Sequence, residues 1–243
     1  MGTVRTYQAV PVTDVSCELC EGPRWDGERG EFLWVDIIHD TFRRAAWDGS
    51  RLSVIATYPT AGPVGAVASV AGGGWLAAVG TGFTAVAPDG TATAVATTPD
   101  PGLPSRMNDA ECDPSGRFWA GVMPYDTTQR GTGGLYRLDP DGSVHVAVAH
   151  ATIPNGLAWS EDGTRMWWVD SGDATVWTFA VAADGTLAGR SAFYVHRGAG
   201  VPDGICRDLD GQLWVAINGG GEVRRFAADG SQSAVVTFPD ATQ

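Results

Sequence analysis

Lysine is absent from this chain of 243 residues, and all 16 basic residues are arginine. Its absence excludes Schiff-base catalysis, a lysine general base and the phosphate-binding lysine of a Walker motif. Long apolar runs are absent too, so we expect no transmembrane helix. The first residues lack the apolar core of a signal peptide, and we therefore expect a cytoplasmic protein.

Cysteine and histidine are scarce, with four of each. Cys17 and Cys20 have the C-x-x-C spacing, but no second pair and no nearby histidine completes a zinc site. We therefore expect four reduced thiols, with Cys20, Cys112 and Cys206 close to the channel described below. The sequence contains no Gly-x-Ser-x-Gly, and no Gly-x-Gly-x-x-Gly opens a helix, which argues against a serine hydrolase and a dinucleotide-binding fold.

The formal net charge is −12. Such an acidic balance argues against nucleic acid or an anionic membrane as a partner. It suits cations and neutral or weakly charged metabolites, although solubility alone explains most of the charge. Because 44% of the residues are hydrophobic, the chain can bury an ordered core.

Five short motifs recur along the chain at nearly constant spacing. Their central positions, 21, 65, 108, 155 and 203, lie 44, 43, 47 and 48 residues apart. A repeat of this length is typical of a β-propeller, with one four-stranded blade per repeat. The sequence therefore predicts a single all-β domain over residues 1–243, with five blades evident. The motifs are Cys20-Glu21-Gly22-Pro23, Val64-Gly65-Ala66, Met107-Asn108-Asp109, Pro154-Asn155-Gly156 and Pro202-Asp203-Gly204.

Nine Asp-Gly dipeptides punctuate the sequence, and this pair is typical of the turns between adjacent strands. Each repeat opens at its motif with one strand, and a second strand rich in Trp and Val returns after a turn. We find no amphipathic helix. The predicted returning strands cover 32–35, 75–79, 118–122, 166–169 and 213–217, and outer strands follow at 134–138, 175–179 and 222–226.

The central residues of the five motifs are Glu21, Gly65, Asn108, Asn155 and Asp203. Equivalent positions in successive blades lie at one height around the central axis, so two carboxylates and two amides should converge on one channel. Oxygen ligands of this kind suit Ca²⁺, Mg²⁺ or Mn²⁺. Gly65 has no side chain and is expected to leave room for a substrate. Arg106 is expected to reach over the pocket and to bind hydroxyl or carboxylate oxygens.

A second ring is predicted fifteen residues after the first, where the returning strand reaches the same face again. Side chains there would flank the mouth of the pocket. For Asp36 and Asp170 there is an alternative interpretation, in which their side chains only accept hydrogen bonds from backbone amides in turns. The predicted residues are Asp36, Gly80, Met123, Asp170 and Asn218.

Five segments of the chain resemble the family of gluconolactonase, regucalcin (senescence marker protein) and luciferin-regenerating enzyme. The resemblance covers residues 14–235 and implies a six-bladed propeller that hydrolyses sugar lactones with a divalent cation. By this resemblance Glu21, Asn155 and Asp203 are the metal ligands, and Arg106 and Asn108 bind the substrate. Ca²⁺ is the preferred ion, with Mn²⁺, Mg²⁺ and Zn²⁺ as alternatives. The matching segments are Glu-Gly-Pro-Arg-Trp at 21–25, Arg-Met-Asn-Asp at 106–109, Ile-Pro-Asn-Gly-Leu-Ala-Trp at 153–159, Val-Pro-Asp-Gly at 201–204 and Gly-Gly-Gly-Glu-Val-Arg-Arg-Phe at 219–226.

The chain departs from the family in its last repeat. Family members continue through a final C-terminal blade that pairs with an N-terminal strand, here 5–10, and that blade is expected to be missing from this sequence. An unclosed propeller exposes strand edges, so a homo-oligomer is one way to close it.

The predicted function is therefore a metal-dependent lactonase that opens sugar lactones to hydroxy acids. Asp203 would serve both as a metal ligand and as the general base that activates water. The main alternative is a non-enzymatic calcium-binding propeller that acts as a binding or regulatory module, because propellers host many functions. A different hydrolase or a strictosidine-synthase-like propeller is a further alternative.

Overall fold

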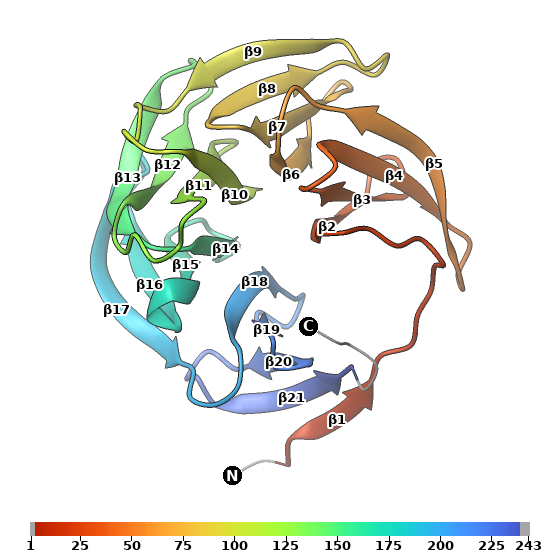
Figure 1. The fold of residues 1–243 in the computed structure, drawn as a ribbon. Coiled ribbons are helices and arrows are strands. Elements are labelled where there is room, and N and C mark those ends of the chain that lie inside the picture. The colour runs from red at the N-terminus through yellow and green to blue at the C-terminus, as the bar shows by residue number, and fades with distance from the viewer. Residues whose placement is uncertain (1–2, 239–243) are drawn as a thin grey trace.

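Each repeat forms a four-stranded antiparallel sheet, because short runs rich in Trp and Val alternate with turns that contain Asp-Gly. The computed structural model describes residues 3–238, and Figure 1 shows five such sheets, blades I to V, around a central axis. Blade I comprises β2 (Cys20–Asp26), β3 (Glu31–Asp36), β4 (Thr41–Trp47) and β5 (Leu52–Pro59), and blade II comprises β6 (Val64–Ser69), β7 (Trp75–Val79), β8 (Gly82–Val86) and β9 (Ala92–Thr97). Blade III comprises β10 (Ser105–Cys112), β11 (Phe118–Pro124), β12 (Gly133–Leu138) and β13 (Val144–Ala151). Blade IV comprises β14 (Pro154–Trp159), β15 (Arg165–Asp170), β16 (Thr175–Val181) and β17 (Leu187–Val195), and blade V comprises β18 (Val201–Arg207), β19 (Leu213–Asn218), β20 (Glu222–Phe226) and β21 (Gln232–Thr237).

The sheet order confirms the predicted all-β propeller and its division into repeats. The predicted returning strands lie within β3, β7, β11, β15 and β19, and the predicted outer strands lie within β12, β16 and β20. Among residues 3–238 the one helical element is the short 3₁₀ turn η1 (Ser171–Asp173). None of the described helical structure has the length and apolar character needed to cross a bilayer.

The N-terminal strand β1 (Arg5–Gln8) joins blade V. It pairs in parallel with β21, so that Arg5 lies opposite Ala234 and Gln8 opposite Thr237. The resemblance implies pairing of this strand with a final blade that is expected to be missing here, and in the described residues the strand pairs with the outer edge of the fifth blade instead. Five blades account for the sheets within residues 3–238, and the six-bladed architecture implied by the resemblance stays a prediction.

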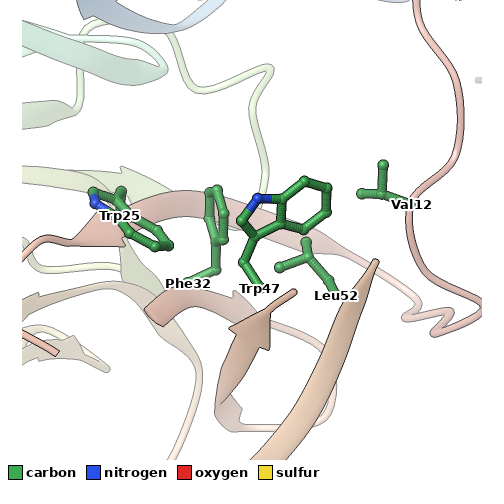
Figure 2. Close-up of a pocket in the computed structure, with 5 residues that line it drawn as sticks. All are labelled: Val12, Trp25, Phe32, Trp47 and Leu52. Carbon is green, nitrogen blue, oxygen red and sulfur yellow. The ribbon is translucent and has the colours of Figure 1, made fainter. Parts of the chain in front are cut away.

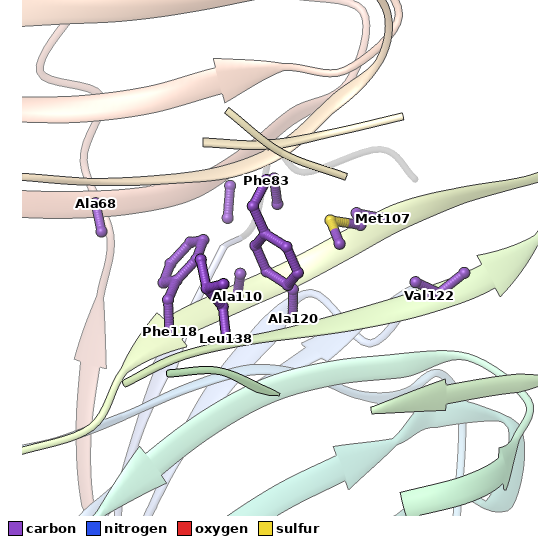
Figure 3. Packing of buried hydrophobic residues seen from close by; sticks show 10 residues of the cluster. Ala68, Phe83, Met107, Ala110, Phe118, Ala120, Val122 and Leu138 are labelled. Carbon is purple, nitrogen blue, oxygen red and sulfur yellow. The ribbon is translucent and has the colours of Figure 1, made fainter. Parts of the chain in front are cut away.

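Apolar clusters fill the interfaces between consecutive blades, from I and II to IV and V. Figure 3 shows the cluster between blades II and III, where Phe83 faces Phe118 with ring centroids 6.0 Å apart. Met107, on the innermost strand of blade III, is fully buried in the same cluster. Because side chains alternate across a strand, each blade can pack against both neighbours and hold its inner strand at a fixed height.

Blades V and I share no such cluster within the described part of the chain. Instead, the segment 9–19 runs from β1 to β2 across this side (Figure 1), where the Leu52 N–H donates to the Val12 carbonyl at 2.8 Å. An apolar groove of about 450 Å³ lies there, and two of its aromatic residues, Trp25 and Trp47, are 49% and 37% exposed. Figure 2 shows the lining residues, which are Val12, Trp25, Phe32, Trp47 and Leu52.

The cysteines differ from their prediction. Cys17 and Cys20 form a disulfide, because the chain entering β2 brings their Cα atoms to 5.5 Å, within the range that a disulfide requires. The prediction of four reduced thiols is therefore wrong for this pair. Cys112 and Cys206 are free.

Candidate functional site

A β-bulge interrupts the innermost strand of every blade at the predicted ring position. A bulge leaves one residue unpaired, bends the strand and re-aims the side chain beside it. The five ring residues therefore depart from strict alternation at the place where the strands surround the central axis. The register shifts lie between Glu21 and Arg24, Val64 and Ala66, Met107 and Ala110, Pro154 and Leu157, and Pro202 and Ile205.

Two glycines let neighbouring inner strands approach each other closely. A Cβ atom at Gly65 would collide with the backbone of Asn108, and one at Gly156 would lie 2.7 Å from the Asp203 backbone oxygen. The prediction that Gly65 leaves room for a substrate is therefore wrong, since the backbone of β10 occupies that space. Both glycines instead fix the distance between the strands that carry the polar ring.

Three carboxyl groups, of Glu21, Asp109 and Asp203, interact at the ring, where Arg24 acts on Asp109 and Arg106 acts on Glu21. Burial, reinforced by the charges of Asp203 and Asp109, raises the pKa of Glu21 from 4.5 to about 8. Burial likewise raises the pKa of Asp109 to about 7 and moves the pKa of Asp203 upward. The guanidinium of Arg106 interacts with Glu21, but burial lowers the pKa of Arg106 itself. The site thus favours an added cation.

A chain of hydrogen bonds links the amides of the ring. Arg106 Nη1 donates to Asn108 Oδ1 at 2.7 Å, and Asn108 Nδ2 donates to Asn155 Oδ1 at 2.9 Å. Asn155 Nδ2 then donates to Ser171 Oγ at 2.9 Å, and Ser171 Oγ donates to the Pro202 carbonyl at 2.6 Å. The structure therefore brings together residues of blades III, IV and V, and both asparagines are only 8% exposed.

The predicted second ring returns to the height of the first, but its members make different contacts. Asn218 lies next to the site, because its Nδ2 donates to Asp203 Oδ2 at 2.9 Å. Asp170 instead accepts from the backbone N–H groups of Thr152 and Ile153, both at 2.9 Å, as the alternative interpretation expected. Met123 is buried and lies opposite Arg106 in the sheet register.

Asp36 makes side-chain as well as backbone contacts. It accepts from the Leu19 N–H at 3.4 Å, and its Oδ2 lies 3.1 Å from His39 Nδ1 and 3.4 Å from Arg43 Nη2. These bonds tie the entry of β2 to the β3–β4 turn, so Asp36 contacts the chain just before Glu21. Gly80 has a positive φ of 57° and contributes no side chain.

Asp109 and Ser171 are parts of the site that the sequence reasoning did not single out. Asp109 had a readable signal, because it is acidic where the equivalent residues of the other blades are small. Ser171 had no such signal in the sequence, because its position in the site depends on the turn that follows β15. The small equivalents of Asp109 are Gly22, Ala66, Gly156 and Gly204.

The ring offers a mixed set of oxygen donors. Within residues 3–238, histidine, cysteine and carboxylate side chains alone form no group of three that could hold a metal ion. A metal site at the ring would therefore need an amide oxygen beside the carboxylates, and Asn155 is the predicted donor. Carboxylate and amide oxygens together are donors that hard cations prefer. A cavity of about 360 Å³ has Asp203 and Asn218 among its lining residues.

Comparison with known proteins agrees with the propeller fold. The family model described as the SMP-30/gluconolactonase/LRE-like region matches residues 19–243. The chain belongs to this family. It is 34% identical to regucalcin of Xenopus laevis over 94% of this chain and 78% of that protein. It is 33% identical to the pentonolactonase XacC of Haloferax volcanii over 91% of this chain and 74% of that protein.

Solved structures of the SMP-30/gluconolactonase/LRE-like family superpose on this fold. The calcium-binding protein regucalcin of Agrobacterium tumefaciens has a TM-score of 0.88 at 27% identity, with 98% of this chain and 81% of that chain covered. A luciferin-regenerating enzyme has a TM-score of 0.84 at 26% identity, with 92% and 78% covered. The family thus includes relatives named for lactone hydrolysis and relatives named for calcium binding.

Proposed function

We propose that this protein is a divalent-metal-dependent hydrolase that opens sugar lactones to hydroxy acids. The observation that supports the proposal is the electrostatic interaction of Glu21 with Asp203 at the bulges of their inner strands, together with Asn155 at the corresponding bulge of blade IV. Membership of a family that includes a pentonolactonase supports the reaction class. A small-molecule lactone would be the partner, with no need for nucleic acid or a membrane, and action in the cytoplasm is proposed on the sequence alone.

The residues present fit a hard divalent cation, with Ca²⁺ preferred and Mn²⁺, Mg²⁺ or Zn²⁺ as alternatives. The raised pKa of Glu21 supports this fit, because a carboxyl that is disfavoured as an anion gains most from a cation beside it. Glu21, Asn155 and Asp203 would hold the ion. A bound ion would supply polarisation of the lactone carbonyl and stabilisation of the negative charge that develops on its oxygen.

The chain's own residues would carry the remaining tasks. Arg106, which Asn108 holds at 2.7 Å, would bind hydroxyl oxygens of the sugar and orient the ring. Asp203 would accept the proton of the attacking water while Asn218 fixes its second oxygen at 2.9 Å. The water oxygen bonds to the carbonyl carbon, the ring C–O bond breaks, and the leaving oxygen takes up the proton.

The test is pH-stat hydrolysis of five- and six-membered aldonolactones by metal-stripped protein, with each of the four ions added back. We expect turnover that needs an added ion and that falls at least 100-fold in Asp203→Ala, because that change removes a ligand and the base together. Asp162→Ala, in an exposed turn, serves as the matched control and should retain full activity. Full activity of Asp203→Ala would contradict both proposed roles.

The second candidate is a non-enzymatic calcium-binding module. It is favoured by the regucalcin relatives, one of which is described as a calcium-binding protein. Saturable Ca²⁺ binding by folded protein, without turnover of any lactone in the panel, would support this alternative and refute the lactonase. The two proposals share one metal site, so the same preparation decides between them.

A further inference from the structure

The series of hydrogen bonds in the ring runs in one direction, because the group at one end can only donate and the group at the other end can only accept. Arg106 can only donate, and the backbone carbonyl of Pro202 can only accept. Asn108 is held a second time, since its Nδ2 also donates to the Pro154 carbonyl at 3.0 Å. Each bond in the chain therefore has one allowed donor and one allowed acceptor.

Ser171 and Asn108 hold the Asn155 amide from its two sides, and Ser171 fixes the side that carries the nitrogen. A serine hydroxyl has one proton, and Ser171 gives it to the Pro202 carbonyl at 2.6 Å. Its oxygen must then accept from Asn155, which places the Asn155 nitrogen on the Ser171 side and the Asn155 oxygen on the Asn108 side of the ring. Both Ser171 and Asn155 are buried, so water cannot easily substitute for the lost partner.

Ser171 is itself held in place by its neighbours. Its backbone N–H donates to the Ile153 carbonyl at 3.0 Å, and its carbonyl accepts from the Ala174 N–H at 3.0 Å. Asp170 caps the same turn by accepting from the Gly172 N–H at 3.1 Å. The hydroxyl thus connects two strands of the site, β14 with Asn155 and β18 with Pro202 and the adjacent Asp203.

We propose that Ser171 is a positioning residue of the metal site. It keeps the Asn155 oxygen available to the ion and sets the position of β18 next to Asp203. The inference rests on the proposed function, because it takes these residues as metal ligands. Partners that orient a ligand typically change metal affinity about 10- to 100-fold when they are removed.

The experiment measures Ca²⁺ affinity by isothermal titration calorimetry on metal-stripped protein, so its readout does not depend on turnover. Ser171→Ala should weaken Ca²⁺ binding about 10- to 100-fold. Thr175→Val is the matched control, because Thr175 is equally buried and its hydroxyl anchors the same turn through the Asp173 carbonyl at 2.9 Å without contacting Asn155. It should leave Ca²⁺ affinity within about twofold of the original.

Repeating the Ser171→Ala change in an Asn155→Asp protein separates loss of the Asn155 orientation from a general loosening of the site. In Asn155→Asp both terminal atoms are oxygens, so the side chain no longer depends on Ser171 to present one. Ser171→Ala should therefore weaken Ca²⁺ binding much less in the Asn155→Asp protein than in the original. An equal loss in both backgrounds, or an equal loss in Thr175→Val, would overturn the positioning role.

The outcomes also distinguish this inference from the proposed function. Tight Ca²⁺ binding that Ser171→Ala leaves unchanged refutes the positioning role and leaves the metal-dependent hydrolase standing. If the unsubstituted protein is folded but binds none of Ca²⁺, Mg²⁺, Mn²⁺ or Zn²⁺, that result refutes both the metal site and the role of Ser171.

Discussion

Glu21→Gln should stabilise the metal-free protein at alkaline pH. The pKa of Glu21 is raised from 4.5 to about 8 in the folded chain, so between these values the folded state binds a proton that the unfolded state has released. Stability of the metal-free protein therefore falls as pH rises through this window. At about 1.4 kcal/mol for each pKa unit, the loss reaches up to about 5 kcal/mol at pH 8.5. Glutamine resembles the protonated carboxyl group and does not ionise, so the Gln variant should not lose this stability as the pH rises.

Urea unfolding in a chelator at pH 5, 6.5 and 8.5 measures this effect. The Gln variant should match the original at pH 5 and exceed it increasingly toward pH 8.5. Glu18→Gln is the control, because the Glu18 side chain is 64% exposed and should show no such trend. Identical pH dependence of the original and Glu21→Gln would refute the reasoning. Adding Ca²⁺ at about 100 times its dissociation constant should stabilise the original by about 2.7 kcal/mol and the Gln variant far less.

Three further variants test the packing and the substrate site. Phe118→Ala should lower the free energy of unfolding by about 3–5 kcal/mol, measured by urea titration, because it empties the cluster between blades II and III. Gly156→Ala should destabilise by about 1–3 kcal/mol and reduce lactone turnover, because its methyl group would push against β18; unchanged stability would contradict the close approach. Arg106→Gln should raise KM for the lactone about 10-fold or more while calorimetry shows little change in Ca²⁺ affinity, and the reverse pattern would make Arg106 part of the metal site.

Much of the fold could be read from the spacing of the motifs. The 43- to 48-residue period and the Asp-Gly turns placed five blades and their returning strands, because both signals are local in sequence. The ring positions followed from the same period. That Asn108 and Asn155 lie within hydrogen-bond distance agrees with the prediction that equivalent residues of adjacent blades converge.

Other features depended on contacts that no local pattern encodes. The pairing of β1 with β21 joins the two ends of the chain, and the need for glycine at position 65 comes from the backbone of the next blade. The raised pKa values of Glu21 and Asp109 likewise arise from burial and from carboxylates that lie far apart in the sequence. Ser171 shows the difference most clearly, because a hydroxyl can orient an amide only after three blades have packed. The sequence alone therefore determined which polar groups each blade contributes. Tertiary packing decided how far apart those groups lie, how their bonds are directed and how far burial raises their pKa values.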